Sequence, residues 1–247
     1  DAVLKTPCAM KCAMGGSPKG HGRRGGSPQT RMGVVAMLDN ELIKAREYLE
    51  KKEAAKDKSE LPARDDKAEA LLPVLRREIP IKVHCEQFDM VSVIELAKKH
   101  NIRYTIDHGW SSNVYMEELV AGGGPVLFGP IGIADSYSEA DGGDVLLLKE
   151  LDESGLEVSI ISDCPVYTPD LLMITAGEAV RCGVDPVRAL RMLTINPARA
   201  LGVDDRVGSI AVGKDADFAI FEGEPAVDCA AHVCCTIIDG QIVWQKE

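Results

Sequence analysis

Short apolar runs alternate with segments of helical periodicity from residue 79 onward. The runs have the length of buried strands, and the segments between them place apolar residues three and four apart. Strands that alternate with helices of this length indicate βα units, and parallel strands buried on both faces read as continuous apolar runs. The predicted strands are residues 79–86, 102–109, 125–130 and 156–166, and the predicted helices lie within 89–101, 113–124, 138–155 and 170–183.

The pattern differs at the two ends of the chain. Residues 15–30 are rich in Gly, Ser and Pro and predict a loop, whereas residues 30–60 show the spacing of an amphipathic helix. A short helix is expected within 66–78. Near the C-terminus, two helices precede short strands with glycine turns; Asn196 is expected as the N-cap and Pro197 as the first residue of the second helix. We therefore predict an α/β portion over residues 1–202 and a small β portion over 203–247.

Composition narrows the possible partners. The formal net charge of −11 argues against nucleic acid or an anionic membrane as a partner, and no apolar run reaches the roughly 18 residues of a membrane span. The eight cysteines lie mostly in apolar stretches of a large chain, which favours reduced, buried thiols over disulfides. We expect a cytoplasmic protein that acts on a small-molecule substrate and forms a homo-oligomer.

Polar residues stand at the carboxyl ends of the predicted strands. His84 and Glu86 end the first, His108 ends the second and Asp163 ends the fourth. The carboxyl ends of the strands of a (β/α) barrel line one active face, so residues distant in sequence meet there. A lone histidine at a strand end is more often structural, and it is the repetition that favours a metal site.

Other residues of functional type are weaker candidates. His100 at a helix end is expected on the surface, and His232 lies in a C-terminal strand region. Trp110 and Tyr137 are candidates for a pocket lining, although an aromatic residue after a strand is as often packing.

Four segments carry a resemblance to a known family: "KVHCE", "IDHG", "ISDCPV" and "LTINPARALGVDDRVGSIAVGKDADFAIFEG". They resemble the metal-dependent hydrolases of the amidohydrolase superfamily, on the imidazolonepropionase-like side. The resemblance implies a partial (β/α)8 TIM-type barrel with a C-terminal β-sandwich element. It also implies zinc or another divalent cation that activates water against an amide, cyclic amide or amidine bond. His84, His108 and Asp163 match the family's metal ligands, and Asp163 matches its catalytic proton shuttle.

The chain also departs from that family. The His-x-His pair of the first strand has no match, since no two of the five histidines are two positions apart. Gly16 stands where close relatives have a Glu, and Lys11 is a weak match to a carboxylated lysine ligand. The resemblance therefore implies the last two thirds of such an enzyme. Two alternatives stay open: a catalytically silent homologue, and a prolidase-like metallopeptidase on the same fold.

Overall fold

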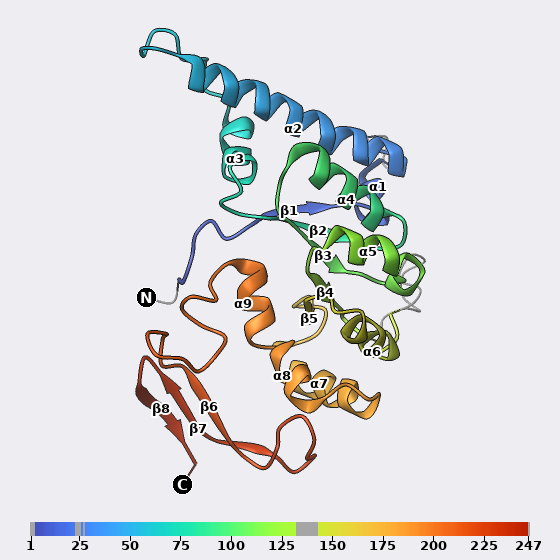
Figure 1. Ribbon diagram of the computed structural model, residues 1–247, viewed down its shortest axis with the longest axis vertical. Coiled ribbons are helices and arrows are strands. Elements are labelled where there is room, and N and C mark those ends of the chain that lie inside the picture. The colour runs from blue at the N-terminus through green and yellow to red at the C-terminus, as the bar shows by residue number, and fades with distance from the viewer. Residues whose placement is uncertain (1–2, 23–25, 27, 132–142, 247) are drawn as a thin grey trace.

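The computed structural model describes residues 3–22, 26, 28–131 and 143–246. Its centre is a five-stranded sheet in the order β1-β2-β3-β4-β5, in which every neighbouring pair is parallel (Figure 1). This confirms the α/β class and the parallel sheet. The described residues contain five strands of this sheet and not the eight of a complete barrel. The strands are β1 (Met10–Ala13), β2 (Ile81–Cys85), β3 (Tyr104–His108), β4 (Val126–Phe128) and β5 (Val158–Ile160).

Helices connect the strands, as the alternating pattern predicts. Figure 1 shows α4, α5 and α6 side by side along the sheet, with the long helix α2 beyond α4. The helices are α1 (Gly16–Gly22), α2 (Arg31–Ala54), α3 (Asp66–Leu75), α4 (Asp89–His100), α5 (Met116–Gly122), α6 (Leu146–Glu153), α7 (Leu172–Arg181), α8 (Pro186–Arg191) and α9 (Ile195–Leu201).

The two faces of the sheet carry different side chains because successive residues of a strand point to opposite sides. The helix-covered face belongs to the apolar core and consists of Ile81, Val83, Ile106, Val126 and Phe128, each fully excluded from water. The strand register places polar residues together on the other face. What we call the polar face includes Lys11, Lys82, His84, Thr105, Asp107 and Ser159, together with one apolar residue, Leu127.

The C-terminal strands form a second, antiparallel sheet in the order β6-β7-β8 (Figure 1). They are β6 (Phe218–Glu222), β7 (His232–Ile238) and β8 (Gln241–Gln245). The predicted β portion is therefore one separate three-stranded sheet. Several of its apolar side chains are exposed, among them Ile242 at 62% and Trp244 at 48%. The division between residues 1–202 and 203–247 stays a prediction.

Two elements near the N-terminus differ from the sequence expectation. Residues 15–30 were expected to form a loop, but Gly16–Gly22 form α1. Met10–Ala13 form β1, which the sequence pattern does not reveal because the run is four residues long and includes a lysine. The strand is defined by its parallel pairing with β2, in which Cys12 lies beside Val83. Tertiary pairing thus decides a conformation that local propensity leaves undecided.

The start of α9 also corrects an expectation. Asn196 does not cap this helix, because α9 begins at Ile195 and Thr194 occupies the N-cap position. The Asn196 side-chain amide instead donates to the Val158 carbonyl at 2.6 Å, and the Ile160 amide donates to the Met192 carbonyl at 3.0 Å. These two bonds occupy the outer edge of β5.

The cysteines are free thiols, as predicted, and all eight lie in the described residues. Their burial differs from the prediction: Cys85 and Cys235 are buried, while Cys164 and Cys229 are exposed. Among the helices that the structure describes, none combines the length and the apolar character that crossing a membrane requires.

Candidate functional site

His84 and His108 lie side by side at the carboxyl ends of β2 and β3. Their ring centroids are 4.3 Å apart and their planes meet at 68°. By strand alternation His108 belongs with Ile106 on the helix-covered face. Its φ of +77° lies in the left-handed region, which is uncommon for a residue with a side chain, and its ring contacts His84 on the polar face. A strained backbone conformation at such a position is a reason to look for function there.

The surroundings of His108 fix its protonation. Its Nδ1 lies 2.7 Å from the Gly129 carbonyl oxygen, and since a carbonyl only accepts, Nδ1 carries the hydrogen. Burial lowers the pKa of His108 below its usual value, against opposing effects of the Gly129 bond and the Asp163 charge. The ring is therefore neutral at pH 7, and its Nε2 carries a lone pair that accepts no hydrogen bond from the described residues.

Two neighbours support this arrangement. Gly129 has a φ of +130°, and an added Cβ would clash with the Ile161 carbonyl oxygen, so glycine is required where β4 meets the segment after β5. The Trp110 ring centroid lies 4.8 Å from that of His108 and covers part of it. Trp110 is 4% exposed, and its Nε1 finds no hydrogen-bond partner within the described residues. Trp110 is therefore part of the site, whereas Tyr137 lies outside the described residues.

Asp163 follows the carboxyl end of β5, so it lies at the same end of the parallel strands as the two histidines. It is exposed, its φ is +50°, and its charge acts on the pKa of His108. Glu86 is buried, and its Oε2 lies 3.4 Å from His84 Nε2. No group of three or more His, Cys, Asp or Glu side chains in the described residues is arranged to hold a metal ion. The structure thus brings the two histidines into contact and leaves Asp163 nearby, outside that pair.

A charged network on the polar face was not predicted from the sequence. The Asp107 carboxylate accepts hydrogen bonds from Lys82 Nζ at 3.0 Å, Lys11 Nζ at 2.8 Å and Thr105 Oγ1 at 2.7 Å. Burial raises the pKa of Asp107, but the two lysines and the hydroxyl outweigh it and hold the pKa below its usual value. The alternation of Lys82 and His84 along β2 was the available signal for this network.

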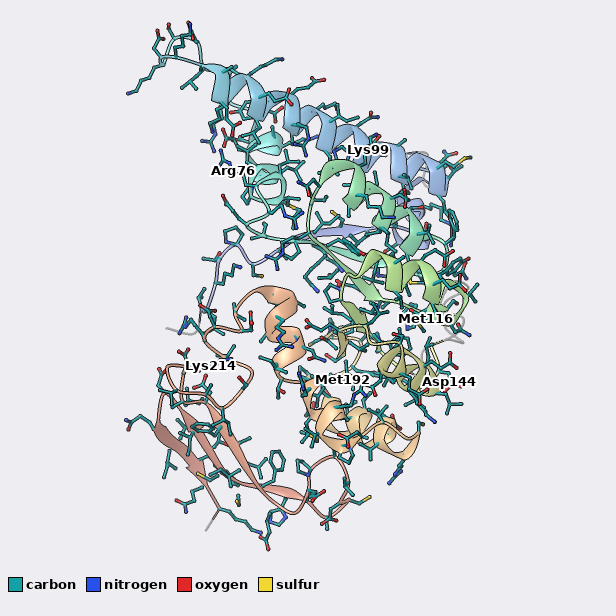
Figure 2. All side chains as sticks on the ribbon, in the orientation of Figure 1. Arg76, Lys99, Met116, Asp144, Met192 and Lys214 are labelled. Atoms are coloured by element: carbon teal, nitrogen blue, oxygen red, sulfur yellow. The ribbon has the colours of Figure 1, made fainter. Side chains whose placement is uncertain are left out.

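Two other histidines lie away from the site. His100 was expected on the surface, but it is 4% exposed, and its Nε2 lies 2.7 Å from Asp39 Oδ1. Lys99 binds the same carboxylate at 2.6 Å between α2 and α4 (Figure 2). A helix-end histidine is thus buried because α2 packs on α4. His232 begins β7 and is exposed.

Comparisons with known proteins agree with the resemblance read from the four segments. The model of the family described as "Amidohydrolase family" matches residues 45–243. An amidohydrolase structure from Thermotoga maritima MSB8 is similar over 99% of this chain and 64% of that one, with 31% identity and a TM-score of 0.92. The imidazolonepropionase of Shewanella frigidimarina is 43% identical over 84 residues, which cover 32% of this chain and 20% of that protein.

The amidohydrolase tasK of Hapsidospora irregularis is similar over a longer stretch. It is 26% identical over 240 residues, or 91% of this chain and 24% of that protein. The chain therefore spans about a quarter or less of these two curated relatives and 64% of the Thermotoga structure.

Proposed function

Because the chain belongs to the amidohydrolase family, we propose that it carries a metal-dependent hydrolase centre for the carbon–nitrogen bonds of amides, cyclic amides or amidines. One observation carries this proposal. His108 is neutral, donates from Nδ1 to a backbone carbonyl and keeps Nε2 free beside the His84 ring. Metal-binding histidines in proteins commonly donate their second nitrogen to a carbonyl or carboxylate in this way.

The donor set fits a divalent cation in its chemistry. Neutral imidazoles suit zinc, and a carboxylate is an accepted third ligand, so His84, His108 and Asp163 would hold it. A cation bound there would supply a water molecule whose pKa is lowered toward about 7. The left-handed backbone of both His108 and Asp163 supports a functional reason for their placement.

The protein's own groups then have separate tasks in the hydrolysis. The Gly129 carbonyl keeps the His108 ring in one orientation, and Trp110 shields part of that ring from water. Asp163, whose carboxylate is exposed, would accept a proton from the attacking water and return it to the leaving nitrogen. Glu86 lies within reach of His84 and would orient its ring.

A catalytically silent homologue is a second candidate, and a specific observation favours it. The described residues form no group of three metal-binding side chains, and the sequence has no His-x-His pair. A catalytic zinc usually takes three protein ligands, so two adjacent imidazoles alone would hold zinc weakly. Metal content separates the two candidates.

The test is zinc stoichiometry after dialysis, measured beside hydrolysis of a panel of cyclic amides and X-Pro dipeptides. We expect weak zinc binding and slow turnover, and we expect His108→Ala to abolish both. His232→Ala is the matched control, because His232 is exposed on β7, and it should retain both. A wild-type chain without zinc or turnover would favour the silent homologue. Zinc binding that survives His108→Ala would place the metal elsewhere.

Location and assembly belong to the same proposal. The eight free thiols support a reducing compartment, for which we propose the cytoplasm. The exposed apolar side chains of β8, among them Ile242 and Trp244, support a homo-oligomer. Light scattering of the purified chain tests the oligomer, and a monomer at micromolar concentration would contradict it.

A further inference from the structure

A cavity lies at the amino ends of the parallel strands, whereas the two histidines lie at the carboxyl ends. It has a volume of about 400 Å³. Pro80 precedes β2 there, Arg103 precedes β3, Pro125 precedes β4 and Glu157 precedes β5. The proposed hydrolase function uses none of these residues.

The lining of this cavity is cationic, although the chain as a whole has a net charge of −11. Arg77, Lys98, Arg103 and Arg199 line it, and Glu157 is the one acidic residue among the described residues around it. Such a local excess of positive charge in an acidic protein requires an explanation.

Helix ends explain part of the excess. Cations are favourable near the C-terminus of a helix, and Lys98 and Arg199 lie in the last turns of α4 and α9. They also have acidic partners: Lys98 Nζ lies 3.1 Å from Glu95, and Arg199 Nη1 lies 3.5 Å from Glu157. Arg77 donates to the Asn101 side chain at 2.8 Å. These three cations have reasons to be there without a ligand.

Arg103 differs in its partners: among the described residues it has no acidic or amide partner, and its terminal nitrogens lie beside Gly202, the C-cap of α9. It lies in the connection before β3 rather than in a helix, and it is half-buried. Across the described part of the chain, its guanidinium has no hydrogen-bond or ion-pair partner. Lys5 adds a second charge nearby, and its Nζ donates to the Leu201 and Gly202 carbonyls at 3.3 Å. An atom built as Cβ on Gly202 would lie 3.1 Å from Lys5 Nζ and 3.9 Å from both terminal nitrogens of Arg103. An anion in the cavity would supply acceptors that the described residues do not offer to this guanidinium.

Tyr104 offers a further donor at the same cavity. Its hydroxyl oxygen accepts from the Gly124 amide at 3.2 Å, which leaves the hydroxyl hydrogen available. Burial raises the pKa of Tyr104, so the hydroxyl keeps its proton at neutral pH. Gly124 must be glycine, because an added Cβ would clash with the Tyr104 ring. The ring and its hydroxyl are thus held in one place.

We propose that this cavity binds a phosphate group, with Arg103 as its principal ligand and Tyr104 and Arg199 as further donors. The planar guanidinium matches two phosphate oxygens at once, and the remaining oxygens accept from the neighbouring donors. The phosphate belongs either to inorganic phosphate or to a small phosphate monoester. The site is separate from the hydrolase centre, so its occupancy does not depend on a bound metal.

The experiment is calorimetric titration of the full chain, freed of metal with a chelator, at constant ionic strength. Inorganic phosphate and glycerol phosphate are the two probes, and acetate is the carboxylate comparison. We expect both phosphates to bind and Arg103→Gln to weaken binding about tenfold or more. Arg76→Gln changes the net charge equally and should alter affinity less than about twofold; Arg76 is exposed at the end of α3, outside the cavity lining (Figure 2).

The two probes distinguish the sources, since tighter binding of glycerol phosphate identifies a monoester and equal binding identifies the free ion. Acetate binding as tightly as phosphate would overturn the proposal, as would equal weakening by the two variants. A second measurement needs no variant: phosphate should slow phenylglyoxal modification of Arg103 in the wild-type chain and leave Arg76 unaffected, by mass spectrometry. An unchanged rate at Arg103 would also overturn the proposal.

Discussion

On the helix-covered face of the five-stranded sheet, Ile81, Val83 and Ile106 are fully excluded from water by helices. On the polar face of the same strands, Lys82 and Asp107 form a hydrogen-bonded ion pair. Lys82 lies two positions before His84, and Asp107 lies one position before His108. The first face has apolar contacts that many aliphatic side chains could supply. The second has directional bonds, each of which requires a particular donor or acceptor. The comparison indicates that stability is concentrated on one face and chemistry on the other.

We expect the largest loss of stability from a substitution on the helix-covered face. Ile106→Ala removes buried methyl groups from the centre of the core, so we expect unfolding free energy to fall by about 4 kcal/mol in urea denaturation. Val212→Ala is the control, because Val212 is fully exposed, and it should change stability by less than about 0.5 kcal/mol. A loss below about 1 kcal/mol for Ile106→Ala would show that this face does not dominate stability.

A smaller effect is expected on the polar face. Asp107→Asn keeps the side-chain shape but removes the charge that Lys82 and Lys11 share, so we expect a loss of about 2 kcal/mol in the same assay. Asn40→Asp is the control: it also changes the charge by one, but at an exposed position of α2 outside this network. If Asp107→Asn were neutral, the network would be dispensable for folding, and the contrast between the two faces would sharpen.

The same network predicts a pH dependence. The pKa of Asp107 in the folded protein lies below its usual value, so the folded state binds fewer protons there than the unfolded state. Its contribution to stability is full above about pH 5 and is lost as the pH falls through the usual carboxyl value of about 4 and then through the lower folded value. The stability difference between wild type and Asp107→Asn should therefore shrink in acid. If the stability difference between the two proteins stayed constant from pH 7 to pH 3, the prediction would be wrong.

The smallest effect is expected at the border strand. The Lys11 side chain is 59% exposed, so its ion pair with Asp107 is screened by solvent. Lys11→Gln should cost less than about 1 kcal/mol, whereas Lys82→Gln should cost more, because the Lys82 side chain is 21% exposed. Chemical denaturation of the two variants, compared side by side, gives the order. Equal losses would mean that burial does not govern these two pairs.

Much of the fold follows from the apolar pattern. The runs at β2, β3, β4 and β5 are buried strands, and the helices between them show the expected spacing. β1 and α1 were not predicted, because Met10–Ala13 and Gly16–Gly22 are short and lack periodicity. Asn196 was assigned to a helix cap by its residue type, but it binds the backbone of a strand distant in sequence. Local patterns do not contain such contacts.

The site was predictable in part. The strand-end rule selected His84 and His108, and the structure places their rings in contact. It did not select Gly129, whose role depends on a close approach between two strand ends. It also did not reveal that Asp107 accepts hydrogen bonds from two lysines, Lys11 and Lys82. Lys11 lies on β1, which was not predicted from the sequence. Asp163 as a metal ligand stays a prediction.

The hydrogen bonds of Asn196 and Met192 at the outer edge of β5 affect how copies of the chain would aggregate at high protein concentration. A border strand with unpaired N–H and C=O groups is a template to which another extended segment can add. Sheets that aggregate grow from such strands. At β5 the Asn196 side chain and the Met192 carbonyl occupy the backbone groups that an added strand would use. Within the described residues, β1 has no equivalent cover at its border. If another extended segment adds to this sheet, we therefore expect it to add at β1 and not at β5.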